Sequence, residues 1–168
     1  RSKGVPEVSS FPDLSFPGVQ RGKLKNGIEV VLAERHSVPV VNVALQFDAG
    51  YASDAGGKLG TASFAANMLD EGTASLDSVQ IAQTRERLGL NLSTGCGLDA
   101  CTANANLLKA NMAPSLALLA DVVRNASYPQ AELDRERKRT IDGLQVALKD
   151  PGSLANMVAT RVFYGDAG

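Results

Sequence analysis

The sequence is poor in the residues and runs that mark several specialised classes of protein. It has no tryptophan, one histidine and two cysteines among its 168 residues, and aromatic residues make up 5% of it. Neither charge is in excess, because 17 basic and 18 acidic residues leave a formal net charge of -1. This balance argues against a nucleic-acid or anionic-membrane binder that relies on bulk charge. No run approaches the roughly 18 consecutive apolar residues of a membrane span, so no membrane insertion is expected.

The two cysteines, Cys96 and Cys101, are too few for the disulfide framework of a small secreted domain. They either face each other across a hairpin or are two unconnected small residues. The segment between them is short and disulfide geometry is restrictive, which favours the unconnected state. We therefore expect unpaired cysteines. The histidine, His36, lies in a polar stretch between two apolar runs, a setting typical of a turn residue rather than of a catalyst.

The composition that remains is that of one globular domain with a real core. The chain is 44% hydrophobic and 21% charged, and its length suits a single domain. The first residues are rich in Ser and Pro and have no apolar core of the signal-peptide kind. We expect a linker or N-terminal arm over residues 1–20 and a domain over residues 21–168. Both ends look cut from a longer protein, and the domain is expected to be truncated at its C-terminal end.

Three segments have the pattern of strands. Residues 22–32 predict two short strands joined at Asn26-Gly27, the strongest short hairpin signal, because both residue types tolerate positive φ. Residues 41–48 alternate between apolar and polar, which predicts a half-buried strand. Residues 90–108 are small, alternating and interrupted by turn residues. They predict a hairpin with its turn near residues 97–99.

The remaining segments predict helices. A buried helix is expected over residues 61–69, and a second begins at a capping box formed by Asp77 and Gln80 and ends at Gly89. Proline opens later helices at Pro114 and Pro129, and Pro151 ends the long helix before a last one begins. The long charged helix has a mainly apolar stripe that is expected to face inward: Leu133, Arg137, Ile141, Leu144 and Leu148. The order of elements favours an α+β fold of two layers, with an antiparallel sheet packed against helices.

Five segments, taken in order, carry a family resemblance: residues 24–30; Pro39 with the strand ending at residues 48–50; residues 60–73; residues 116–123; and residues 133–137 followed by Asp150-Pro151 and residues 164–166. This ordered set resembles the pitrilysin-type (insulinase-like) family of zinc metallopeptidases. The match covers nearly everything after Gly22. The resemblance implies the α+β fold of one half of such a peptidase.

The third segment bears on the chemistry. In active members of the family it carries His-x-x-Glu-His, two zinc ligands and a general base on one helical face. Alignment on Gly60 and Gly72-Thr73 places that motif at residues 63–67, so Ser63 and Asn67 replace the histidines and Ala66 replaces the base. The remaining ligand, a Glu on the long helix, falls at or beside Gly143. The resemblance therefore implies neither catalytic residues nor a zinc or other cofactor site in this chain.

The helices also carry residues that resemble a nucleic-acid site or a nucleophile, but each has a more ordinary interpretation. Residues 135–139 are a run of charge typical of a solvated helix face rather than of a nucleic-acid site. Glu136 matches a family position near the zinc site and is expected to keep a structural hydrogen bond there. Ser63 is not expected to act as a nucleophile, because no base stands near it in the sequence.

The resemblance also implies a function. Families of this type pair a catalytic half with a degenerate half around a chamber that holds the peptide substrate. We expect this chain to be the non-catalytic half, with zinc and proteolysis supplied by a homologous catalytic half or subunit, so that the whole assembly is a zinc metalloendopeptidase. The alternative is a structural subunit of a larger assembly, as in the core proteins of the cytochrome bc complex. Self-association of the isolated chain and, among several compartments, a bacterial periplasmic location are further expectations.

Overall fold

A computed structural model describes Asp13 and residues 15–165, and these divide into two compact units between Pro39 and Val40. Most of the arm predicted for residues 1–20 lies outside the described residues, as does Asp166, and the predicted domain boundary stays a prediction. No helix in the described part of the chain has the length and apolar content needed to cross a membrane.

The first unit contains a two-stranded antiparallel hairpin. Strand β1 (Val19–Lys23) pairs with β2 (Glu29–Ala33). In the turn, Gly27 has a φ of 91° and its amide donates to the Leu24 carbonyl at 2.9 Å, while the Asn26 side chain accepts from the Ile28 amide. The predicted Asn-Gly hairpin is therefore confirmed, since a left-handed residue and a side-chain acceptor are what this turn uses.

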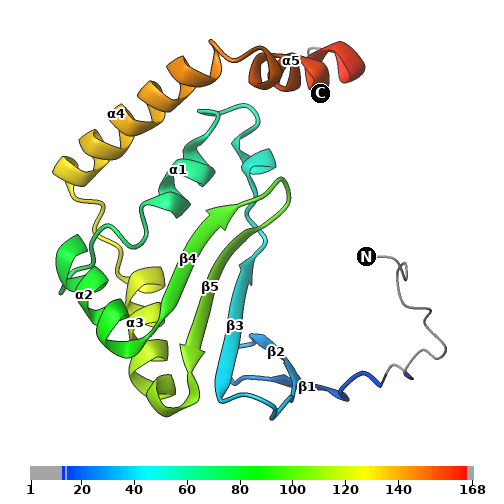
Figure 1. The fold of residues 1–168 in the computed structure, drawn as a ribbon, viewed down its shortest axis with the longest axis vertical. Coiled ribbons are helices and arrows are strands. Elements are labelled where there is room, and N and C mark those ends of the chain that lie inside the picture. Colours follow the sequence, from blue (N-terminus) through cyan, green and yellow to red (C-terminus); the bar gives the residue numbers. More distant parts are fainter. Residues whose placement is uncertain (1–12, 14, 166–168) are drawn as a thin grey trace, which may run out of the picture. The chain divides into compact units, whose positions relative to one another are not determined.

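The second unit contains an antiparallel sheet in the order β3-β5-β4, formed by β3 (Val40–Phe47), β4 (Asn91–Cys96) and β5 (Cys101–Leu108). Figure 1 shows α1, α2 and α3 gathered on one side of this sheet. The predicted α+β fold with an antiparallel sheet packed against helices is confirmed. The helical elements, in chain order, are η1 (Tyr51–Asp54), α1 (Thr61–Asn67), α2 (Ser78–Leu88), η2 (Lys109–Asn111), α3 (Met112–Arg124), α4 (Gln130–Ala147) and α5 (Pro151–Tyr164).

The core of this unit lies between the sheet and helices α2 and α3. The period of two in β5 buries Ala103, Ala105 and Leu107, and the small alanines leave room for helix side chains to approach the strand. The predicted alternation of β3 is also present, because Val41, Val43 and Leu45 are partly buried against the core. The other buried members of the cluster are Ile81, Leu88, Leu90, Leu92, Leu118, Leu119 and Val122.

Helix ends follow the predicted signals. The Asp77 carboxylate accepts from the Gln80 amide at 2.8 Å, and the Gln80 side chain accepts from the Asp77 amide at 3.0 Å, so the capping box of α2 is complete. Gly89 ends this helix with a φ of 62°. Asp150 caps α5 through the Ser153 amide at 2.7 Å. These contacts satisfy amides that have no partner within their own helix.

The apolar stripe of α4 does not face inward as predicted. Ile141, Leu144 and Leu148 are 48%, 51% and 57% exposed. Periodicity determines which residues share a helical face, but it does not determine whether another element covers that face. Helix α5 likewise exposes Leu154, Val158 and Val162. This part of the chain therefore presents apolar surface rather than core.

Candidate functional site

Helix α1 brings together three of the four predicted motif positions. Ser63, Ala66 and Asn67 are spaced i, i+3 and i+4, which places them on one face of the helix. Ala66 is buried, Ser63 is partly buried and Asn67 is exposed. The helix begins after Gly60, in the left-handed region, and the Asp54 carboxylate accepts from the Ala62 amide in its first turn.

The fourth position, Gly143, is not brought into contact with these three. It lies on an exposed face of α4, and a Cβ placed there would have no described heavy atom within 4 Å outside its own helix backbone and chain neighbours. The structure therefore places the four predicted positions on two helices that do not touch at Gly143.

The donor groups at these positions do not suit zinc. Serine and asparagine offer neutral oxygens, whereas alanine and glycine have no side-chain donor, and zinc in proteins is bound by imidazole, thiolate or carboxylate. In the described part of the chain, no group of three or more His, Cys, Asp or Glu residues is arranged to hold a metal ion. An alanine at the base position also has no group that can move a proton.

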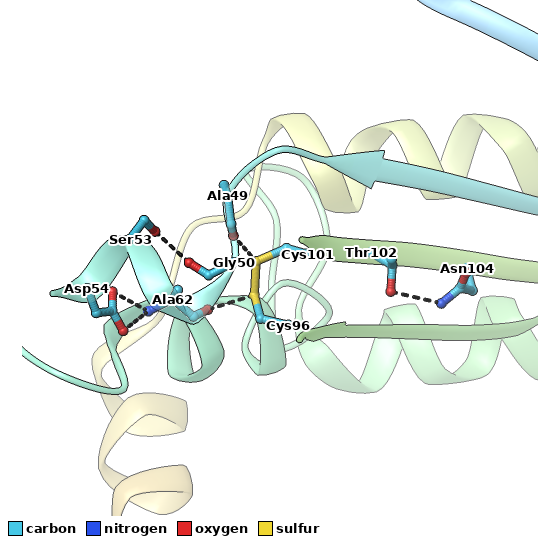
Figure 2. Close-up of a disulfide and its surroundings, with 9 residues drawn as sticks. All are labelled: Ala49, Gly50, Ser53, Asp54, Ala62, Cys96, Cys101, Thr102 and Asn104. Atoms are coloured by element: carbon cyan, nitrogen blue, oxygen red, sulfur yellow. Dashed lines mark hydrogen bonds between the residues drawn. A yellow bond between two sulfur atoms is a disulfide. The ribbon is translucent and has the colours of Figure 1, made fainter. Parts of the chain in front are cut away.

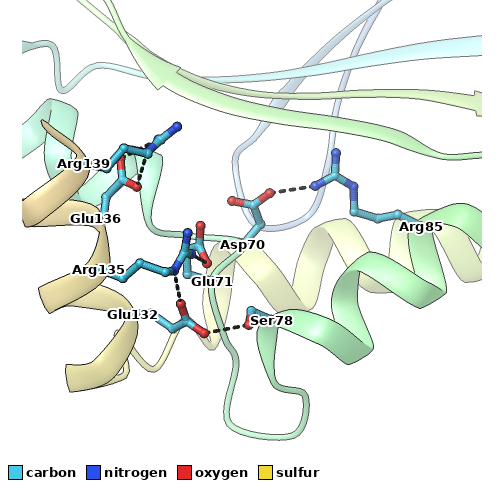
Figure 3. Close-up of polar contacts among 8 residues, drawn as sticks. All are labelled: Asp70, Glu71, Ser78, Arg85, Glu132, Arg135, Glu136 and Arg139. Atoms are coloured by element: carbon cyan, nitrogen blue, oxygen red, sulfur yellow. Dashed lines mark hydrogen bonds and ion pairs between the residues drawn. The ribbon is translucent and has the colours of Figure 1, made fainter. Parts of the chain in front are cut away.

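Glu136 is the buried carboxylate of α4, and its oxygens are already engaged. Its side chain accepts from Arg139 Nε at 2.8 Å and from Arg139 Nη2 at 2.6 Å (Figure 3). The residue is 3% exposed, and the hydrogen bonds from Arg139 hold the pKa of the carboxyl below its ordinary value. Glu136 thus makes hydrogen bonds within its own helix. The expected hydrogen bond near a zinc-site position stays a prediction. A cation of its own helix occupies both oxygens.

A second polar cluster joins α4 to the segments around α2. Arg135 pairs with Glu132 at 2.7 Å and reaches Glu71, after α1, at 2.5 Å. Ser78, at the start of α2, donates to Glu132 at 2.7 Å (Figure 3). The charge run of residues 135–139 is a largely solvated, ion-paired helix face, as predicted. Its Arg135 also anchors the start of α4, which the sequence did not indicate.

A groove of about 870 Å³ lies between α1 and α4. Its walls are largely apolar, with Lys58 and Arg137 among the residues that line it. Because successive helical residues are about 100° apart, the face of α1 that lines the groove is opposite the face that carries Ser63 and Asn67. The groove and the predicted motif positions are therefore separate features. The apolar lining residues are Leu59, Phe64, Ala65, Met68, Leu133, Ile141 and Leu144.

The two cysteines form a disulfide, so the expectation of unpaired cysteines is wrong (Figure 2). Cys96 ends β4 and Cys101 begins β5, and they are direct partners in the register of that hairpin. Their Cα atoms are 3.9 Å apart. Strand pairing brings the two side chains together, and the short loop between them is no obstacle. The signal available in the sequence was their placement on either side of the predicted turn near residues 97–99.

Comparison with known proteins gives a consistent family. The family model for insulinase (peptidase family M16) matches residues 29–165. A probable mitochondrial-processing peptidase subunit beta of Arabidopsis thaliana is 27% identical over 124 residues, 74% of this chain and 23% of that protein. An uncharacterized zinc protease of Rickettsia bellii is 26% identical over 132 residues, 79% of this chain and 32% of that protein.

A solved structure adds a similarity of fold. The crystal structure of a peptidase M16 inactive domain from Pseudomonas fluorescens matches with a TM-score of 0.77 and 29% sequence identity. The match covers 86% of this chain and 35% of that one. The chain thus spans between 23% and 35% of the length of these three proteins.

Proposed function

From the premise that this chain belongs to the insulinase family of peptidases (peptidase family M16), we propose that it is the non-catalytic half of a zinc metalloendopeptidase assembly. In this role it completes the chamber and supports peptide binding. A homologous half carries zinc and cleaves the substrate. The similarity to a peptidase M16 inactive domain supports the proposal.

The observation that carries the proposal is the chemistry of α1. At the positions where the family resemblance expects His-x-x-Glu-His, this helix has Ser63, Ala66 and Asn67. The helix itself is present, with its Ala62 amide bound by the Asp54 carboxylate and its residues in contact with β4. A helix that keeps this place in the fold without histidine or glutamate at the motif positions supports a non-catalytic role. A half of this kind can shape a chamber but has no group at these positions to activate water.

A homologous partner is supported by the relatives. The Arabidopsis protein is a probable mitochondrial-processing peptidase subunit beta, and the Rickettsia protein is an uncharacterized zinc protease. In the assembly, zinc belongs to the homologous half. The peptide substrate is expected to add as a strand to a sheet edge, where backbone hydrogen bonds give sequence-tolerant affinity. Strands β3 and β4 are the edges of the sheet in the second unit.

The apolar groove supports a further part of the assembly. The relatives are about three to four times as long as the part that this chain matches. We assign the groove between α1 and α4, and the exposed apolar face of α4, to contact with polypeptide that corresponds to that additional length. Without that contact, the exposed Ile141 and Leu144 favour self-association.

The Cys96–Cys101 disulfide supports an oxidising compartment, since disulfides persist in the periplasm and outside cells and are rare in a reducing cytosol. A bacterial periplasmic location is therefore part of the proposal. Fractionation of cells that express the full-length protein, followed by detection of this chain with an antibody, tests this location.

The decisive experiment measures zinc content and cleavage of an unstructured peptide, first with this chain alone and then with its candidate homologous half. We expect no bound zinc and no cleavage from the chain alone, and chelator-sensitive cleavage from the combination. One tightly bound zinc in this chain, with chelator-sensitive cleavage, would overturn the proposal. A stable complex whose cleavage of peptide does not depend on this chain would instead favour the structural-subunit alternative.

A further inference from the structure

We propose that the Cys96–Cys101 disulfide is a redox modification site that a dithiol can reduce, and that its oxidation state controls the order of η1 and the first turn of α1. The disulfide lies at the end of the β4–β5 hairpin, where both segments meet it (Figure 2). The inference does not depend on the proposed peptidase role. It depends on the contacts of the hairpin end alone.

The loop that the disulfide closes binds η1 directly. The Tyr51 amide donates to the Gly97 carbonyl and the Ala52 amide donates to the Leu98 carbonyl, both at 3.0 Å. Gly50 is buried against the same loop, and a Cβ there would lie 2.0 Å from the Leu98 carbonyl oxygen. The backbone of residues 97–99 therefore holds the start of η1 directly.

The side chain of Asp54 connects η1 to the start of α1. Both oxygens of Asp54, the last residue of η1, lie 3.2 Å from the Ala62 amide, near the start of α1. Cys96 Sγ lies 3.3 Å from the Ala62 carbonyl oxygen, so the same residue also touches the disulfide. The helix that carries Ser63 and Asn67 thus begins at a point held by the hairpin end.

The two sulfur atoms are accessible to a reductant, and each has an acceptor within reach once it is reduced. Both cysteines are partly exposed, which leaves the disulfide open to attack by a thiolate. Cys96 Sγ faces the Ala62 carbonyl oxygen and Cys101 Sγ faces the Ala49 carbonyl oxygen. After reduction each thiol has a carbonyl acceptor in place for its proton, so neither S–H is left without a partner.

The reaction is a thiol–disulfide exchange with a dithiol. A thiolate of the dithiol attacks one sulfur of the Cys96–Cys101 bond, which breaks and leaves a mixed disulfide. The second thiolate of the dithiol then attacks the sulfur of the same dithiol molecule in that mixed disulfide, and the second protein cysteine leaves as a thiolate. Two electrons and two protons reach Cys96 and Cys101, while the dithiol is oxidised to a disulfide.

Hydrogen exchange on the whole chain tests the proposal, with the oxidised protein compared with protein reduced by dithiothreitol. We expect the amides of Tyr51, Ala52 and Ala62 to exchange about tenfold faster after reduction, because the hairpin end that holds them opens more often. The amides of α3, which packs on the far part of β5, serve as an internal control and should not change. A Cys96→Ser/Cys101→Ser variant should reproduce the reduced pattern without any reductant.

Three results would overturn the proposal. Unchanged exchange at Tyr51 and Ala52 after reduction would show that the disulfide does not control η1. If the amides throughout α3 exchanged faster by the same factor, the disulfide would stabilise the whole unit rather than η1 alone. A disulfide that stays intact in dithiothreitol without denaturant, measured by alkylation and mass spectrometry, would show that no dithiol has access to the site.

Discussion

Glu136 and Arg139, one turn apart on α4, form an ion pair in which the carboxylate is buried and the guanidinium is exposed. Both guanidinium contacts are short, at 2.6 and 2.8 Å, while the side chain of Arg139 is 73% exposed and that of Glu136 is 4% exposed. In an asymmetric pair of this kind, the buried carboxylate depends more on its partner than the exposed guanidinium does. Removal of its partner leaves a buried charge, whereas the arginine can turn to solvent.

Glu136→Gln should destabilise the chain by about 1–3 kcal/mol, because the amide keeps one acceptor and places a donor opposite Arg139. Chemical denaturation measures this change. The matched control is Asp134→Asn, since Asp134 pairs with Arg137 on the same helix at 3.8 Å with both side chains exposed. The control should change stability by no more than about 0.5 kcal/mol. If Glu136→Gln lowers the free energy of unfolding no more than Asp134→Asn does, the buried ion pair has no structural role.

Stability should fall in acid. Hydrogen bonds from Arg139 lower the pKa of Glu136, and hydrogen bonds from Ser78 and then Arg135 lower the pKa of Glu132. A carboxyl whose pKa is lower in the folded state binds its proton more readily when unfolded, so its contribution is present at neutral pH and is lost as the pH falls. We expect the thermal unfolding midpoint to stay constant between pH 6 and 7 and to fall below about pH 4.5. In Glu136→Gln the midpoint should fall less steeply.

Two glycines should respond to alanine in opposite directions. A Cβ at Gly50 would lie 2.0 Å from the Leu98 carbonyl oxygen, so Gly50→Ala should destabilise the chain by about 3 kcal/mol. Gly143 lies inside α4, where a Cβ meets nothing within 4 Å, so Gly143→Ala should stabilise the chain by about 1 kcal/mol. Thermal unfolding of both variants measures the difference. A stable Gly50→Ala protein would contradict the contact between η1 and the β4–β5 hairpin.

The local rules of the sequence predicted the elements of the fold. Asn26-Gly27 specified a turn, Asp77 with Gln80 specified a helix start, and the alternation in residues 41–48 specified a half-buried strand. Each of these signals acts through contacts within a few residues, which is why one sequence suffices to find them. The order of the elements then led to the fold class.

The long-range contacts could not be predicted in the same way. The length of the loop between the cysteines predicts that they are unpaired, whereas the strand register that pairs Cys96 with Cys101 is a property of the folded hairpin. The spacing of the stripe of α4 predicts an inward face, whereas Ile141 and Leu144 line an open groove in the structure. The alignment that places the family's remaining glutamate ligand at or beside Gly143 stays a prediction, since separation along the chain does not determine contact between helices.

The isolated chain should self-associate through the apolar groove between α1 and α4. Ile141 and Leu144 line this groove and are about half exposed. Contact with another apolar surface would remove these side chains from water, which lowers the free energy. Ile141→Glu/Leu144→Glu should therefore shift the chain toward the monomer in sedimentation velocity. The matched control is Val146→Glu, because Val146 is 70% exposed on the same helix and does not line the groove. A wild-type chain that stays monomeric at all concentrations, or a control that acts as strongly as the double variant, would show that the groove does not drive association.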